Sequence, residues 1–312
     1  MEVVHGHRDM PASRGAAVAI GNFDGVHVGH RALLDRARSL AAARGLRAVA
    51  LTFDPPPAAV LSGQAAPRVS SLARRLELLA AAGVDATVVE PFTRELAAWS
   101  ADAFVDDIVL GALGARAIVV GYDFCYGQGR TGSIDSLRAH GGRAGVEVEI
   151  VAPVEVDGEI ASSSKIRAYL RAGDLPAAER MLGRRWDLDG TVVHGAKRGR
   201  ALGIPTANIA PESDLAIAPG IYAVTLTADA GPGGGGGAAL PAVASLGTNP
   251  TFVDGGGLVL EVHVLDWDGD LYDRRVRTTF VARLRDEQRF DSVDALLAQI
   301  HRDIADARAA LA

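Results

Sequence analysis

The chain has 312 residues, and 32 lysines and arginines against 38 aspartates and glutamates give it a formal net charge of −6. This length suggests two domains with separate cores, and a 48% hydrophobic fraction excludes a disordered chain. The mild acidity argues against a nucleic-acid partner, because proteins that bind nucleic acids normally carry an excess of basic residues. It does not exclude small anionic ligands, which need only a local positive charge. The single cysteine excludes an intrachain disulfide, and no apolar run is long enough to cross a membrane. The first residues lack the layout of a signal peptide, so we expect a cytoplasmic protein.

Strand and helix patterns alternate through the first half of the chain. Short apolar runs predict the strands, and apolar residues at helical spacing predict the helices between them. We expect strands at 16–20, 47–53, 86–90 and 116–120, and helices at 31–44, 71–82, 100–113 and 165–182. This alternation is typical of a parallel, doubly wound α/β sheet, in which ligands bind outside the carboxyl ends of the strands.

The pattern changes after Gly183, where a helix stop signal marks the expected boundary between domains at 1–183 and 184–312. Short alternating runs separated by Gly, Pro, Asn and Asp predict a small antiparallel sandwich or barrel. The strands are expected at 190–194, 220–227, 241–246, 258–266 and 274–283. A closing helix is expected at about 291–311, and the glycine-rich run 231–237 is expected to be a flexible hairpin loop.

The strongest local pattern is the decamer GNFDGVHVGH at 21–30, between an expected strand and an expected helix. Its glycines allow the backbone to approach a phosphate, and the helix N-terminus adds unpaired N–H groups. His27 and His30 would stabilise charge on an α-phosphate as pyrophosphate leaves. Two solvated histidines in a surface turn are the alternative, and a zinc site would have only Asp24 as a nearby third ligand.

Two more segments of the first half fit a nucleotide site. Asp123 follows the expected strand 116–120, at a carboxyl end where a polar side chain can hold ribose, base or metal. The serines Ser162, Ser163 and Ser164 precede a helical run and can cap it or bind phosphate. Lys165 and Arg167 add positive charge there.

The second half carries a phosphate-cradling composition at 190–208, GTVVHGAKRGRALGIPTAN. Cations alternate with glycines there, although a basic surface hairpin has the same composition. Thr206 and Asn208 present a hydroxyl and an amide suited to an oxygen-ligated Mg²⁺. Glu261 lies on one face of an alternating run, where it is either a general base or a solvent-facing carboxylate.

These strings resemble one family along almost the whole chain. The decamer is similar to the HxGH signature of nucleotidyltransferases, and GNFDGVHVGHRALL resembles the prokaryotic bifunctional riboflavin kinase/FAD synthetases. VGYDFCYG, SSSKIR, GTVVHGAKRGRALGIPTANI, LGTNPTF and LEVHVLDWDGDLY follow the family pattern in order. The resemblance implies an N-terminal HxGH nucleotidyltransferase domain and a C-terminal six-stranded antiparallel β-barrel riboflavin kinase domain.

The resemblance also implies residue roles and substrates. Riboflavin and ATP would give FMN, and FMN with a second ATP would give FAD and pyrophosphate, both steps with Mg²⁺. Glu261 would be the kinase base, with His27 and His30 acting at the α-phosphate. Nucleotide and phosphate contacts would come from Gly21, Asn22, Phe23, Asp24, Gly25, Asp123, Ser162, Ser163, Ser164, Lys165, Arg167, Gly195, Lys197 and Gly199. Flavin contacts would come from Arg285, Glu287 and Phe290, and metal contacts from Thr206 and Asn208. A homo-oligomer is left open.

One departure bears on the first domain. Pro56 stands where the family has histidine, and proline can neither donate a hydrogen bond nor carry a proton to a phosphate. Whether Arg75 or Lys165 takes over this role is open at this point. Two alternatives follow: a flavin kinase whose first half uses another nucleotide or a flavin analogue, or a regulator whose first half binds without turnover.

Overall fold

The computed structural model describes residues 1–11, 15–63, 66–195, 199, 202–214, 216–229, 237–248 and 258–312. Contacts divide the chain into two compact units, one of residues 1–66 and 75–162 and one of residues 67–74 and 163–312. The chain therefore enters the second unit briefly at 67–74 before it returns at 163. No helix in the described part of the chain has the length and apolar character needed to span a membrane.

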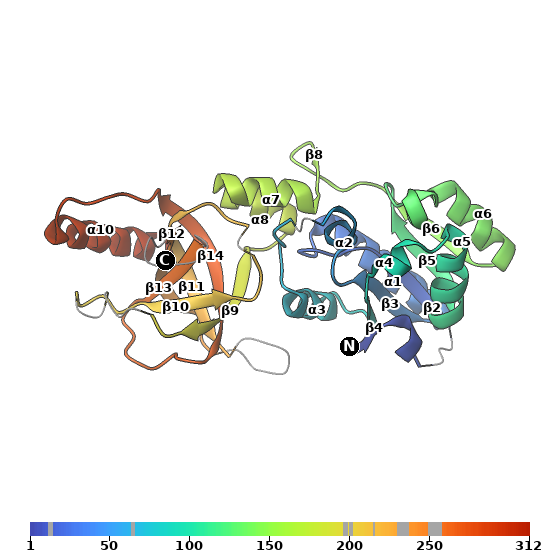
Figure 1. Ribbon diagram of the computed structural model, residues 1–312, viewed down its shortest axis with the longest axis horizontal. Coiled ribbons are helices and arrows are strands. Elements are labelled where there is room, and N and C mark those ends of the chain that lie inside the picture. Colours follow the sequence, from blue (N-terminus) through green and yellow to red (C-terminus); the bar gives the residue numbers. More distant parts are fainter. Residues whose placement is uncertain are drawn as a thin grey trace. The chain divides into compact units, whose positions relative to one another are not determined.

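The first unit contains a parallel sheet in the order β1-β4-β3-β2-β5-β6 (Figure 1). Its strands are β1 (Glu2–His5), β2 (Ala16–Ile20), β3 (Arg47–Phe53), β4 (Ala86–Glu90), β5 (Ala115–Gly121) and β6 (Glu147–Val151). Strand β2 lies between β3 on one side and β5 on the other, so the strand order reverses direction at β2. In sheets of this kind ligands bind beyond the carboxyl ends of the strands at the switch point, so we expect a ligand next to the ends of β2 and β5.

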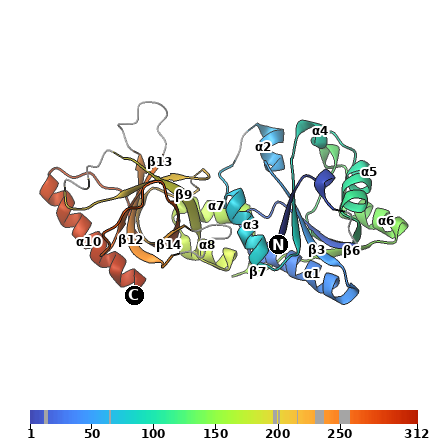
Figure 2. The same ribbon diagram turned by 90° about the horizontal axis from the view of Figure 1, so that it is seen from below.

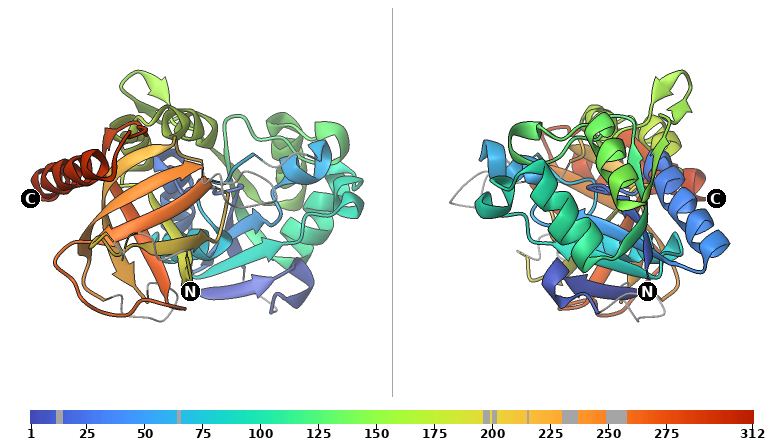
Figure 3. Two further views of the ribbon diagram at one scale, coloured as in Figure 1. Left: turned by 60° about the vertical axis from the view of Figure 1, so that its left-hand side comes forward. Right: turned by 90° about the vertical axis from the view of Figure 1, so that its right-hand side faces the viewer.

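Helices cover both faces of this sheet, as Figure 3 shows for α1 and α6. The helical segments are α1 (Val28–Arg44), α2 (Pro57–Ser62), α3 (Leu72–Ala81), α4 (Arg94–Ala97), α5 (Ala101–Ala103), η2 (Phe104–Ala112) and α6 (Ile134–Ala144), with short turns η1 (His7–Asp9) and η3 (Gln128–Arg130). Ala17 and Ala19 of β2 face α1, whereas Val18 and Ile20 face η2 and α6. A small hairpin of β7 (Glu155–Val156) and β8 (Glu159–Ile160) follows β6.

The second unit is a closed antiparallel barrel in the order β10-β13-β12-β11-β14-β9, seen along its axis in Figure 2. Its strands are β9 (Asp187–Val193), β10 (Ala207–Pro211), β11 (Gly220–Ala228), β12 (Leu240–Thr248), β13 (Leu258–Val264) and β14 (Arg275–Arg285), and its helices are α7 (Ser163–Ala172), α8 (Leu175–Leu182) and α10 (Val293–Leu311). Trp186, Tyr222 and Phe280 pack ring against ring in the core.

Segment 67–74 completes this core. The indole N–H of Trp186 donates to the carbonyl of Val69 at 2.9 Å, and Arg74 Nε donates to Asp187 Oδ1 at 2.9 Å. Both Trp186 and Asp187 are buried. Two buried polar groups of the barrel therefore depend on residues that precede it by more than a hundred positions.

The predicted fold class is confirmed, and the strands expected at 16–20, 47–53 and 86–90 coincide with β2, β3 and β4. The single helix predicted over 165–182 is wrong: Gly173, at φ 75°, separates α7 from α8. β1, β6 and β10 were not predicted: β1 and β10 are short and lack clear alternation, whereas β6 alternates at 147–150 and its signal was missed. Most of the predicted loop 231–237 lies outside the described residues.

Candidate active sites

The decamer 21–30 connects β2 to α1 at the switch point of the sheet. Phe23 is fully buried and anchors the turn in the core. His27 is the N-cap of α1, and its Nδ1 accepts the backbone N–H of His30 at 3.3 Å. Because Nδ1 accepts, the neutral imidazole of His27 carries its proton on Nε2, where it is a hydrogen-bond donor.

The rings of His27 and His30 stack with centroids 3.6 Å apart. A Cβ on Gly29 would lie 3.1 Å from Cε1 of His27, so the glycine between the histidines makes room for the stacked ring. Burial, followed by the charges of His27 and Arg75, holds the pKa of His30 well below its usual value. His30 is therefore neutral at pH 7, and its buried Nδ1 makes no hydrogen bond to the described residues.

Arg75 of α3 lies behind this turn with no solvent exposure. Its Nη1 donates to the carbonyl of Asn22 at 3.1 Å, to that of Phe53 at 3.0 Å and to Thr52 Oγ1 at 3.2 Å. These acceptors lie just after β2 and at the end of β3. Pro56 follows them as the N-cap of α2, where it makes no side-chain hydrogen bond.

Asp123 lies just after β5, the other strand next to β2. Its Oδ1 is close enough to Gly121 that a Cβ there would lie 3.3 Å away. The carboxylate is exposed, as a ligand-facing group must be. The neighbouring Tyr126 is buried, and burial raises the pKa of its phenol, which bonds Ser136 at 3.1 Å. Tyr126 therefore has a packing role, whereas Asp123 is exposed at the carboxyl end of β5.

The serine-rich segment crosses the division between the units. Ser162 ends the first unit, and Ser163, Ser164, Lys165 and Arg167 form the first turns of α7 in the second. Within that turn Arg167 Nη1 donates to Ser164 Oγ at 3.4 Å. Phosphate binding by this segment stays a prediction.

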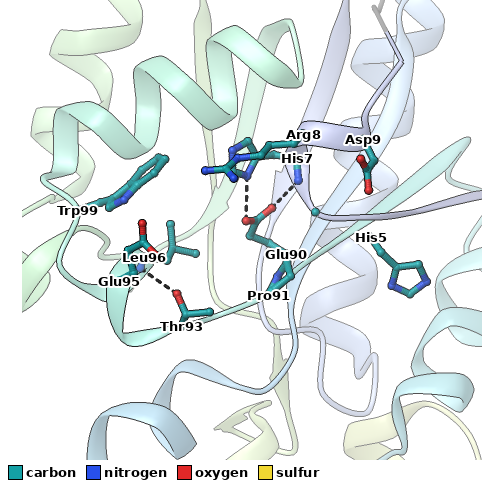
Figure 4. Close-up of a pocket in the computed structure, with 11 residues that line it drawn as sticks. His5, His7, Arg8, Asp9, Glu90, Pro91, Thr93, Glu95, Leu96 and Trp99 are labelled. Carbon is teal, nitrogen blue, oxygen red and sulfur yellow. Dashed lines mark hydrogen bonds and ion pairs between the residues drawn. The ribbon is translucent and has the colours of Figure 1, made fainter.

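A separate pocket of about 330 Å³ lies at the carboxyl ends of β1 and β4 (Figure 4). Its buried carboxylate, Glu90, accepts the backbone N–H of His7 at 2.7 Å and contacts His7 Nδ1 at 2.9 Å. Trp99 meets the His7 ring edge to face at a centroid distance of 6.1 Å. The sequence analysis missed these residues, because His7 and Glu90 are 83 positions apart and form no local motif.

In the barrel, several predicted residues of the second half lie together. Asn208 of β10 and Glu261 of β13 are direct cross-strand partners, so their side chains share one face of the barrel wall. Val262, next to Glu261, points into the core. A Cβ on Gly195 would lie 2.6 Å from Asn208 Cγ, and one on Gly199 would lie 3.4 Å from Thr206 Oγ1.

The two glycines therefore pass directly over the predicted metal-binding residues. A hydroxyl and an amide oxygen beneath a close backbone are ligands that suit Mg²⁺. His263 Nδ1 donates to the carbonyl of Pro205 at 2.8 Å and so ties the loop before β10 to β13. Among the described residues, no group of three or more His, Cys, Asp and Glu side chains is placed to hold a metal ion. Lys197, the remaining predicted residue of this loop, lies outside the described residues.

The predicted flavin-side segment follows β14. Arg285 forms a bidentate pair with Asp303 of α10, at 2.8 and 2.7 Å, and its guanidinium lies 5.9 Å from the centre of the Phe290 ring. A Cβ on Gly247 would lie 2.6 Å from Cδ of Glu287, so this segment folds back onto the end of β12. The segment is therefore held at one end of the barrel, and its contact with flavin stays a prediction.

Two protein families match this chain, one over the first half and one over the second. Residues 9–165 match the family model of FAD synthetase, and residues 182–311 match that of riboflavin kinase. A bifunctional riboflavin kinase/FMN adenylyltransferase from Pseudomonas fluorescens is 41% identical over 99% of this chain and 97% of its own length. The one from Escherichia coli K12 is 37% identical over the same shares.

A solved structure agrees as well. The crystal structure of a protein from Streptococcus pneumoniae, described as a macrolide-efflux protein, has a TM-score of 0.86 and 30% identity over 99% of both chains. Fold and sites together define a two-site transferase that handles nucleotides. The chain belongs to the family of bifunctional riboflavin kinase/FMN adenylyltransferases.

Proposed function

We propose that the chain phosphorylates riboflavin to FMN with ATP and then converts FMN to FAD with a second ATP, releasing pyrophosphate. The observation that carries this proposal is the match of both family models to one chain, each over a unit with its own site. We assign adenylyl transfer to residues 1–183 and phosphorylation to residues 184–312. Both reactions are placed in the cytoplasm, where ATP is available.

In the kinase step, Glu261 accepts the proton of the ribityl 5′-hydroxyl, whose oxygen then attacks the γ-phosphorus of ATP as ADP leaves. Asn208, directly opposite Glu261, and Thr206 would hold Mg²⁺, which supplies charge neutralisation on the phosphates when bound. Gly195 and Gly199 let the backbone of the loop approach the phosphates. The cross-strand register of β10 and β13 supports this division of roles.

In the adenylyl step, a phosphate oxygen of FMN attacks the α-phosphorus of ATP, and the bond to the β-phosphate oxygen breaks. His27 offers its Nε2–H to the charge that develops on the α-phosphate, and His30 adds a second imidazole from the next turn. The glycine-rich turn and the N-terminus of α1 supply backbone N–H groups. Asp123 adds an exposed carboxylate just after β5, the strand next to β2.

The test is chromatography of the products after incubation of the purified chain with riboflavin and Mg-ATP. We expect FMN first and FAD after it, and EDTA should stop both. FMN without FAD would refute adenylyl transfer from ATP. Because Pro56 offers no hydrogen bond, the same assay with CTP and GTP then tests for another nucleotide.

A further inference from the structure

Arg75 is a completely buried cation that donates hydrogen bonds to three neutral oxygens. Its Nη1 joins three acceptors, and one of them, the Thr52 hydroxyl, also donates to the carbonyl of Asn22 at 3.0 Å. The second residue after β2 and the last residues of β3 are thus joined by a single nitrogen. The backbone N–H of Gly21 donates to the carbonyl of Leu51 at 3.1 Å, so Arg75 adds a side-chain link to the backbone bond that joins this turn to β3.

The described contacts of Arg75 also include an ion pair, in which Asp54 Oδ1 lies 3.6 Å from Nη2. Asp54 directly follows β3, so the guanidinium joins this carboxylate as well as the neutral acceptors at the end of the strand. The buried charge therefore has a partner next to the turn that leaves β3.

That charge reaches the histidine pair. After burial and His27, Arg75 is the third influence that lowers the pKa of His30. The same guanidinium contacts Asn22, the second residue of the decamer that contains both histidines. Arg75 is thus linked to the decamer in two ways: it donates a hydrogen bond to Asn22 near the start, and its positive charge acts on His30 at the end.

We propose that Arg75 is a positioning residue of the adenylyl-transfer site, which locks the turn after β2 to the end of β3 and supplies a fixed positive charge behind His27 and His30. This inference rests on the proposed adenylyl transfer. A charge that is already oriented stabilises a triphosphate without reorganisation at the moment of reaction. The charge of Arg75 acts from the protein interior. It can therefore stabilise the phosphates although Pro56 offers no hydrogen-bond donor to them.

The experiment uses the full chain with Arg75→Gln, which removes the charge, and Arg75→Lys, which keeps the charge on a side chain one atom shorter than that of arginine to Nη1. FAD formation is measured from supplied FMN and ATP, and FMN formation from riboflavin in the same preparation reports on the second unit. The imidazole signal of His30, identified by its absence in His30→Asn, is titrated by NMR.

We expect Arg75→Gln to lower kcat for FAD formation about 10- to 100-fold, with FMN formation unchanged. The titration midpoint of His30 should rise in Arg75→Gln and stay in place in Arg75→Lys, because only the first loses the charge. Arg75→Lys should lower kcat by a smaller factor. A purely structural role would leave the His30 midpoint the same in both folded variants.

The proposal is overturned if Arg75→Gln keeps its kcat for FAD formation within twofold, or if the midpoint of His30 does not move. If Arg75→Gln does not fold, a lysine variant with wild-type kcat for FAD formation overturns it instead. Absence of FAD formation by the unchanged chain would refute the proposed adenylyl transfer itself, so the two failures are distinguishable.

Discussion

His30 makes the stability of the first unit depend on pH. Its pKa is low in the folded chain and returns to about 6.5 when the chain unfolds. Below about pH 6.5 the unfolded chain therefore binds a proton that the folded chain refuses, so stability falls as the pH decreases toward the folded pKa. We expect the free energy of unfolding to fall less between pH 7 and pH 5.5 in His30→Asn than in the unchanged chain.

Urea unfolding at the two pH values, followed by circular dichroism, measures this difference. The exposed His301 of α10 gives a matched control for the loss of an imidazole elsewhere. An equal fall in the unchanged chain and in His30→Asn would contradict the burial of a neutral His30.

Glu261 allows a second prediction at this scale. Its replacement by glutamine keeps the shape of the side chain opposite Asn208 but removes the proton acceptor. We expect the rate of FMN formation to fall by about 10² to 10⁴. FAD formation from supplied FMN should be unchanged, which makes the first unit the internal control. A loss of less than fivefold would show that another group takes the proton.

Candidate site residues were predictable from the sequence where they belong to a local motif, because the neighbouring residues in the chain define that motif. His27 and His30 stand in one decamer, and Glu261 stands in an alternating strand. Arg75 and Glu90 act on residues that are distant in the sequence, and only the folded sheet brings them to their partners. A buried arginine on an amphipathic helix looks the same as an exposed one until the packing is known.

Positions 195 and 199 of the loop before β10 should tolerate no residue larger than glycine. A Cβ at residue 195 would overlap the amide of Asn208, and the loop would have to move away from the phosphates. We expect Gly195→Ala to raise KM for Mg-ATP in FMN formation about tenfold or more, with the FAD step unaffected. Gly142→Ala in α6 is the matched control, because its Cβ meets nothing within 4 Å.

Helix α10 is fastened to β14 by one buried ion pair. Asp303 is 3% exposed and accepts two bonds from Arg285 and one from Gln299 at 2.9 Å. We expect Asp303→Asn to lower the free energy of unfolding of the second unit by about 2 kcal/mol, because it leaves the mostly buried guanidinium of Arg285 without its counter-charge. Thermal or urea unfolding measures this change.

The exposed pair of Arg308 and Asp266 is the control, since it joins the same helix to the barrel in solvent. Asp266→Asn should leave the unfolding midpoint unchanged. Equal losses from both variants would show that burial is not what makes the Asp303 pair stabilising.

Elements were predictable when they were long or strongly periodic. The sequence pattern located β2, β3, β4 and α10 to within a few residues. It joined α7 and α8 into one helix because the apolar spacing continues across Gly173, whose positive φ and close approach to Arg283 end the first helix. Strand β10 was missed because residues 207–211 contain polar and proline positions, and only pairing with β9 and β13 makes them a strand.

At the scale of the molecule, the two sites lie on different compact units, which predicts that they can be inactivated separately. The double variant His27→Asn, His30→Asn should convert riboflavin to FMN at the normal rate and form no FAD. Product chromatography with riboflavin and Mg-ATP then shows FMN accumulating. Loss of FMN formation in this variant would mean that the sites depend on each other.

The short excursion of the chain at 67–74 also limits how its gene can be divided. A cut after codon 183 leaves the barrel without Val69 and Arg74, so the indole of Trp186 and the carboxylate of Asp187 lose their partners. The ribosome synthesises segment 67–74 long before the barrel strands. The segment therefore cannot form its native contacts with Trp186 and Asp187 until those strands have been made. A stable isolated kinase half would therefore have to carry those eight residues with it, supplied as a separate peptide or grafted ahead of β9.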